Sequence, residues 1–103
     1  MKKLLTVRRA VPADHPFIYA TYLRNRWFSK ENTTTLQKST WMRLQHARLE
    51  RMLAEQPVLV ACLSSDPDTI LGYRFRDGSE DWTYVKLAFR PEGVQAALEK
   101  ETL

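Results

Sequence analysis

The chain has 103 residues, of which 44% are hydrophobic and 27% are charged. These proportions are typical of a soluble globular domain and exclude a disordered tail, and the length suits one domain. Sixteen basic residues against twelve acidic ones give a net charge of +4, which favours anionic partners such as phosphates, nucleic acid or an acidic protein surface. Because the basic residues are scattered and no nucleic-acid-binding motif is present, a solvated surface explains most of them and nucleic-acid binding is only a distant alternative.

Cys62 is the only cysteine, so no intramolecular disulfide can form. It lies in an apolar run, which predicts a small core residue in a reducing compartment. No segment approaches ~20 consecutive apolar residues, and the apolar start of the chain stops at Arg8 and Arg9. We therefore expect a cytoplasmic protein without a membrane span or signal peptide. His15 and His46 have no partner at metal-ligand spacing, so no metal site is expected.

The first half of the chain predicts one strand and two helices. Residues 4–9 alternate as in a strand, and Pro12 to Asp14 form a helix entry in which Asp14 can accept backbone N–H groups. A helix then runs to about residue 26, and a polar connection covers 27–35. A second helix follows within 36–55 and is closed by Pro57.

Two details of the second helix are predicted from the pattern. Apolar residues at helical spacing mark its buried side: Trp41, Leu44, Leu49, Met52 and Leu53. Its start has two readings. Thr34 with Gln37 can form a capping box, or Ser39 or Thr40 can cap a later start.

The second half of the chain predicts three strands and a helix. Residues 58–63 are almost continuously apolar, as in a strand covered on both faces. Asp66 to Asp68 predict a turn, and the next strand, 70–76, places Leu71, Tyr73 and Phe75 on one side. Asp77-Gly78 indicates a hairpin, from which residues 82–87 return antiparallel. Gly93 then opens a helix over 94–100. The predicted fold class is α+β, in the order β-α-α-β-β-β-α, with a central antiparallel sheet.

The junction between the last strand and the last helix carries the clearest functional signal. A strand that runs through a short turn into a helix start presents unpaired N–H groups and the positive end of the helix dipole, which together bind anions. Gly93 allows close approach of the backbone to a phosphate, and Arg90 adds a charged donor.

This junction resembles the turn with which the GNAT acetyltransferase superfamily grips the pyrophosphate of coenzyme A, (Arg or Gln)-x-x-Gly-x-(Gly or Ala). Arg90 and Gly93 match the first and fourth places, whereas Gln95 stands at the sixth place, where the family has a small residue. The resemblance implies acetyl-CoA or another acyl-CoA as cofactor. It implies these cofactor-binding residues: Val85, Arg90, Pro91, Glu92, Gly93, Val94, Gln95 and Ala96.

The resemblance extends over essentially the whole chain. The segment Val7 to Ala10 with the helix entry at Asp14 looks like the family's first strand and first helix, and 60–63 with 70–73 look like its second and third strands. A softer likeness is to short GNAT-like proteins of bacteriophages. We therefore expect a single GNAT-like domain over 1–103, truncated after the pyrophosphate-binding helix and lacking the family's fifth strand.

If the chain is an N-acetyltransferase that acts on an amine of a protein or small molecule, it needs a base, an acid and an oxyanion donor. Glu80, beside Asp81 at the start of the fourth strand, is the candidate base. Tyr84 is the candidate acid, and N–H groups near Val85 would bind the oxyanion by family analogy.

Two other functions stay open. The first is a catalytically inactive scaffold, phage-encoded, that binds and modulates a host protein through exposed aromatic residues such as Trp27, Phe28 and Trp82. The second is nucleic-acid binding through the basic second helix. The fourth strand is expected to have an exposed edge, which favours a homodimer formed through this strand.

Overall fold

The computed structural model describes residues 5–101, and for residues 90–92 it describes the backbone only. The helices and strands follow in this order: β1 (Leu5–Arg9), α1 (His15–Trp27), α2 (Lys38–Glu55), β2 (Leu59–Leu63), β3 (Asp66–Asp77), β4 (Glu80–Val85) and α3 (Val94–Lys100). Two 3-10 helices, η1 (Pro12–Asp14) and η2 (Leu87–Glu92), precede α1 and α3. The predicted order and the α+β class are confirmed.

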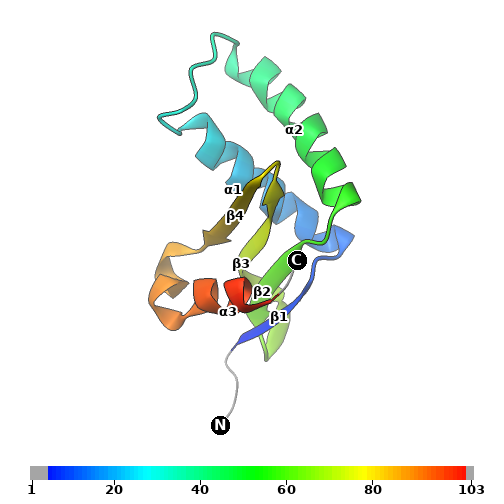
Figure 1. The fold of residues 1–103 in the computed structure, drawn as a ribbon, viewed down its shortest axis with the longest axis vertical. Helices are drawn as coiled ribbons and strands as arrows, with labels where there is room; N and C mark the ends of the chain where they lie inside the picture. The colour runs from blue at the N-terminus through cyan, green and yellow to red at the C-terminus, as the bar shows by residue number, and fades with distance from the viewer. Residues whose placement is uncertain (1–4, 102–103) are drawn as a thin grey trace.

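The four strands form one antiparallel sheet in the order β1-β2-β3-β4, with α1 and α2 on one face and α3 on the other (Figure 1). Alternation along β2 builds both cores. Val60, and Val58 just before the strand, pack among the residues of α1 and α2, whereas Leu59 and Ala61 pack with Leu98 of α3. The prediction of a strand covered on both faces is confirmed, and Cys62 is a buried core residue as expected.

A bulge in β3 corrects the predicted facing of Leu71. Gly72 pairs with Ala61 and Ile70 pairs with Cys62, so Leu71 has no partner of its own in this register. The extra residue rotates the strand locally, and Leu71 therefore joins the core on the α3 side while Tyr73 and Phe75 pack towards α1. The prediction that these three side chains share one face is wrong.

The predicted turn at Asp66 to Asp68 is also displaced. The chain turns at Ser64 and Ser65, and β3 already begins at Asp66, which pairs with Leu63. The next residue of β3 in register is Ile70, so the segment between them bulges out. The Asp66 carboxylate accepts hydrogen bonds from the Asp68 N–H at 3.3 Å and the Thr69 hydroxyl at 2.6 Å, which stabilises the bulge.

The start of α2 follows neither predicted cap. Gln37 is the N-cap residue and makes no capping hydrogen bond with its side chain. Thr34 instead accepts the Leu36 N–H within the preceding loop. Leu44 was predicted to lie on the buried side of this helix, but its side chain is 53% exposed. The reason is that Leu44 lies about 115° around the helix axis from the middle of the buried side.

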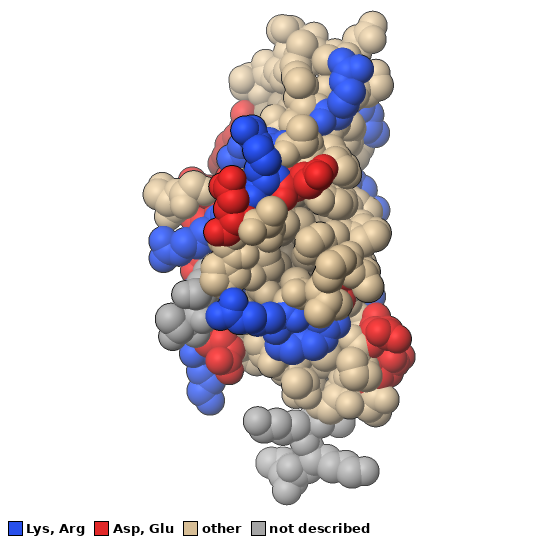
Figure 2. Space-filling model, turned by 90° about the vertical axis from the view of Figure 1, so that its right-hand side faces the viewer, with Lys and Arg blue, Asp and Glu red and all other residues tan. Residues whose placement is uncertain are grey.

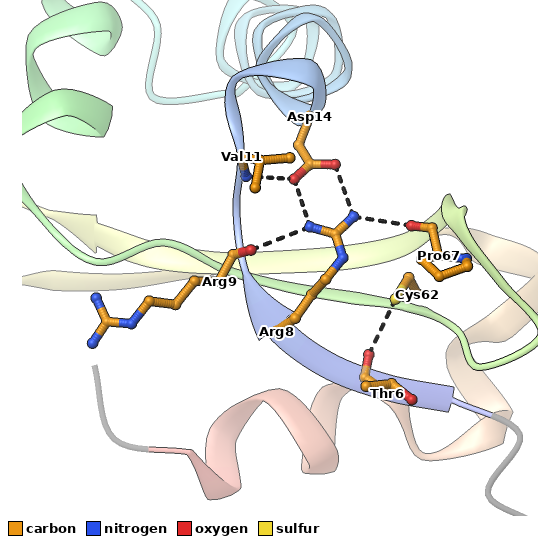
Figure 3. A network of polar contacts seen from close by, with 7 residues as sticks. All are labelled: Thr6, Arg8, Arg9, Val11, Asp14, Cys62 and Pro67. Carbon is orange, nitrogen blue, oxygen red and sulfur yellow. Dashed lines mark hydrogen bonds and ion pairs between the residues drawn. The ribbon is translucent and has the colours of Figure 1, made fainter.

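An ion pair fixes the start of α1 to the sheet (Figure 3). The Arg8 guanidinium donates to both carboxylate oxygens of Asp14, at 2.7 and 3.0 Å, and to the Pro67 carbonyl at 2.9 Å. Asp14 also accepts the Val11 N–H at 2.7 Å, three residues before it, whereas its side chain makes no capping hydrogen bond to α1. Burial alone would raise the pKa of Asp14, but the hydrogen bonds from Arg8 and Val11 outweigh it and lower the pKa.

Figure 2 shows that basic side chains on one face of the molecule form several separate groups, with acidic side chains between them. A mixed surface of this kind gives no continuous positive track for a nucleic-acid backbone on the face shown.

Candidate functional site

The candidate site is the segment that leaves β4 and leads into α3. β4 ends at Val85, and the Lys86 N–H donates to the Leu71 carbonyl at 2.9 Å, at the bulge of β3. The prediction that the strand continues to Leu87 is wrong. Leu87 is 74% exposed and begins η2, in which the Phe89 N–H donates back to the Lys86 carbonyl. A full 3-10 segment, rather than a short turn, therefore separates the strand from the helix.

Gly93 ends this segment in the left-handed conformation, with φ of 76°. A Cβ built at this position would meet no described atom within 4 Å, so the space on the Cβ side of Gly93 is open. The adjacent Val94 is fully buried and anchors the first turn of α3 in the core on that side of the sheet. An exposed glycine next to a buried valine thus fixes the helix start while leaving its backbone accessible. The side chains of Arg90, Pro91 and Glu92 lie outside the described part of the structure.

Gln95 and Ala96 are both exposed on α3. The Gln95 side-chain amide donates to the Glu99 carboxylate at 2.9 Å, one turn further along the helix. Its long side chain therefore lies along the outside of α3 in the direction of the C-terminal end. In this conformation Gln95 does not cover the helix start, although it occupies the place where the family motif has a small residue.

Arg74 on β3 holds the other end of α3. Its guanidinium donates to the carbonyls of Leu98 at 3.0 Å and Glu101 at 2.7 Å, and binds the Asp81 carboxylate with two further hydrogen bonds at 2.9 and 2.7 Å. Hydrogen bonding from Arg74 lowers the pKa of Asp81. Asp81 is therefore engaged in positioning the helix and is a poor candidate for a general base.

Gly72 on β3 allows β4 and α3 to lie close to β3. A Cβ there would lie 2.4 Å from the Tyr84 carbonyl oxygen and 3.4 Å from a methyl carbon of Leu98. Neither Gly72 nor Arg74 was predicted as a site residue from the sequence. Only the spacing of Arg74 and Asp81 on the two arms of a hairpin hinted at their pairing, and nothing in the sequence linked Arg74 to the last helix.

The two candidate catalytic residues do not meet. Glu80 is exposed at the hairpin end of β4, four residues from Tyr84, which corresponds to about 13 Å along a strand. The Tyr84 ring packs against Phe17 of α1 and is stacked on Tyr73, with centroids 6.1 and 5.3 Å away. Tyr84 thus lies on the face of α1, whereas α3 covers the opposite face. The structure does not place either side chain beside the start of α3.

Of the three aromatic residues considered as interface anchors, only Phe28 is largely exposed, at 71%. Trp27 packs edge-on against Trp41, and Trp82 packs edge-on against Tyr22, with centroids 5.2 and 4.9 Å apart. These two tryptophans are therefore half-buried parts of the core on the helical face.

Within residues 5–101, no group of three or more His, Cys, Asp or Glu side chains is arranged to hold a metal ion. In the same part of the chain, none of the helices has both the length and the apolar character needed to cross a bilayer.

Comparison with known proteins finds similarity in structure. No protein-family model and no curated protein matches the sequence. Among solved structures, a GNAT superfamily phosphinothricin acetyltransferase from Sinorhizobium meliloti in complex with AcCoA matches 95% of this chain with a TM-score of 0.63 and 19% identity. The apo form of YjaB from Escherichia coli (TM-score 0.62, 16% identity) and YncA from Salmonella typhimurium with its cofactor acetyl-CoA (TM-score 0.57, 23% identity) also match over 95% of the chain.

The match covers only part of these larger proteins. This chain spans 57% of the phosphinothricin acetyltransferase, 63% of YjaB and 60% of YncA. At identities of this level the similarity concerns the fold.

Proposed function

Starting from its GNAT-like fold, we propose that this chain binds an acyl-CoA, with acetyl-CoA as the natural first ligand to test, at the segment between β4 and α3. The observation that carries the proposal is the open backbone at Gly93, at the start of a helix that is fixed from both ends, in a fold shared with a structure solved with AcCoA. The ligand would supply a thioester and an anionic pyrophosphate. An anion at this position would meet N–H groups that have no acceptor within the helix.

The residues that would hold the pyrophosphate are those of the motif. Arg90 would supply a charged donor, and the backbone from Glu92 to Ala96 would supply N–H groups, with Val85 at the end of β4 beside them. Pro91 has no N–H and would serve only to shape the turn. The charge of the chain, +4, is compatible with an anionic ligand.

Removing the charge of Arg90 is expected to weaken acetyl-CoA binding at least tenfold, because a charge-assisted contact to the pyrophosphate would be lost. Isothermal titration calorimetry of wild type and Arg90→Ala measures this. Arg43→Ala, which removes one charge from the exposed side of α2, is the matched control and should bind like wild type. Equal affinity in all three proteins would contradict the assignment of Arg90.

Shortening Gln95 is expected to change the affinity for acetyl-CoA by less than about twofold, because its side chain extends along α3 towards Glu99. Gln95→Ala, titrated in the same way, tests this. A binding constant that tightens tenfold or more would show that the side chain occupies the ligand's space. A loss of that size would show that Gln95 contacts the ligand.

Acyl transfer to an amine is a further step of this proposal, and it needs a base for the attacking amine. Glu80 and Tyr84, the two candidates, lie about four residues apart on the face opposite α3. Binding therefore has more support than transfer. Release of free thiol from acetyl-CoA with an amine acceptor, compared between wild type, Glu80→Gln and Tyr84→Phe, would separate the two.

The second candidate function is a phage-encoded scaffold that acts by binding a host protein. Exposed Phe28, at the end of α1, is the observation that favours it. The same calorimetric titration distinguishes the two functions, because a scaffold without a cofactor gives no heat with acetyl-CoA in wild type or any variant.

A further inference from the structure

β4 lies at an edge of the sheet. Within residues 5–101 it pairs with β3 and with no other strand (Figure 1). The hairpin that joins the two strands has a two-residue loop, in which Gly78 has φ of 65°, and Asp77 pairs with Glu80. In such a hairpin the pair flanking the loop is hydrogen-bonded, and hydrogen-bonded and non-hydrogen-bonded pairs then alternate. Thr83 therefore directs its N–H and C=O away from β3, towards the open edge.

The side chains of this edge have a distinctive order. Glu80, Trp82 and Tyr84 alternate onto the α1 face, and Lys86 follows on the same face, with its ammonium 5.0 Å from the Phe17 ring centroid. Glu80 is exposed, and the other three are half-buried. Neither Glu80 nor Lys86 forms an ion pair within the described residues. The edge thus presents an acidic group, two aromatic rings and a basic group, evenly spaced.

We propose that this edge binds a second copy of the same chain, with the two β4 strands antiparallel and the two-fold axis passing between the Thr83 residues. In this register Glu80 lies opposite the partner's Lys86, and Trp82 lies opposite the partner's Tyr84. The two-fold axis repeats both pairs, so the dimer gains two ion pairs and two aromatic pairs on one face of a continuous eight-stranded sheet. Thr83 forms a hydrogen-bonded pair with the partner's Thr83 at the centre.

The register is specific, because the order of side chains is self-complementary only about Thr83. If the axis moved to Trp82, Glu80 would face the partner's Tyr84. If the axis moved to Tyr84, Trp82 would face the partner's Lys86 and Glu80 would have no opposite residue. Charge complementarity therefore favours a second copy of this chain as the partner of β4 and sets the register of the two strands. An unrelated peptide would need to reproduce the same order of acidic, aromatic and basic residues.

The pairs flanking Thr83 are of the non-hydrogen-bonded kind, in which opposite side chains approach most closely. Aromatic and opposite-charge pairs across strands contribute roughly 0.2–1 kcal/mol each. A strand-to-strand contact buries less area than a typical stable interface. We therefore expect a dimer that forms and dissociates with concentration in the micromolar range.

Charge reversal gives a sharp test. Sedimentation velocity of the wild type over a range of concentrations should show a rise in mass from 12.1 kDa towards twice that value. Glu80→Lys and Lys86→Glu each place like charges opposite one another and should raise the dissociation constant at least tenfold. The double variant, Glu80→Lys with Lys86→Glu, exchanges the charges and should restore dimerisation. Lys30→Glu, on an exposed loop, is the control for a Lys-to-Glu change.

Circular dichroism of each variant confirms that it is folded before its mass is interpreted. A wild type that stays monomeric up to millimolar concentration would overturn the proposal. Failure of the double variant to dimerise, while both single variants are folded monomers, would also overturn it. None of these readouts involves acetyl-CoA, so failure of the dimer and failure of the proposed cofactor site are distinguishable. The two proposals share Val85, which this register places opposite the partner's Asp81.

Discussion

Gly72→Ala is expected to destabilise the protein by about 2–3 kcal/mol, a large change for a single methyl group. The added carbon would lie 2.4 Å from the Tyr84 carbonyl oxygen and 3.3 Å from the Val85 Cα. Both are backbone atoms of the paired strand, so they can move away only if β4 moves. The urea midpoint of unfolding, with circular dichroism as the probe, measures the effect.

Gly93→Ala is the matched control for this prediction. It adds the same carbon at a position where nothing lies within 4 Å, so its cost is the left-handed φ alone, about 1–2 kcal/mol. If Gly72→Ala is no more destabilising than Gly93→Ala, the close approach of β3 and β4 at the bulge is not as described.

Asp14→Ala is expected to cost about 2–4 kcal/mol, because it removes the carboxylate from a pair that is partly out of water. Asp14 is 4% exposed and accepts three hydrogen bonds, two from Arg8 and one from Val11 (Figure 3). The Arg8 guanidinium would keep only its contacts to backbone carbonyls. The control is Asp68→Ala, at an exposed position near the start of β3, beside the Pro67 carbonyl that Arg8 contacts. It should change the free energy of unfolding by less than about 0.5 kcal/mol.

The Asp14 carboxylate makes the stability of the fold depend on pH, and the stability is expected to fall as the pH falls. Because the pKa of Asp14 is lower in the folded state than its ordinary value of 3.8, it stabilises the fold at neutral pH. That contribution is lost as the pH falls below about 4 and through the folded pKa. The urea midpoint of the wild type should therefore fall more between about pH 7 and pH 3 than that of Asp14→Ala. Equal falls in both proteins would contradict the role of this ion pair.

The sequence predicted the elements well and their local irregularities poorly. Apolar periodicity identifies a strand such as β2, with its buried Val60 and Ala61, because burial on both faces leaves an unbroken apolar run. The bulge at Leu71 has no such signature. It depends on the register between β2 and β3, which is set by the whole sheet.

The sequence predicted the junction between the last strand and the last helix, but not the contacts that hold this junction in place. Gly93 was identified because a glycine at a helix start allows close approach to a phosphate and fills the fourth place of the family's turn, whereas its left-handed φ of 76° was not predicted. The contacts of Arg74 with Leu98 and Glu101 could not be predicted, since they join residues more than twenty positions apart and arise only when α3 packs on the sheet. The separation of Glu80 from Tyr84 was open to prediction from strand geometry, because four residues of a strand span about 13 Å.

The central claim is that an acyl-CoA binds at the segment between β4 and α3, and amide chemical shifts test it most directly. A titration of ¹⁵N-labelled protein with acetyl-CoA, followed by heteronuclear correlation spectra, reports each backbone N–H separately. The account predicts saturable shifts concentrated at Gly93, Val94, Gln95 and Ala96, with little change along α2. No saturable shifts, or shifts centred on α2 and the loop before it, would contradict the claim.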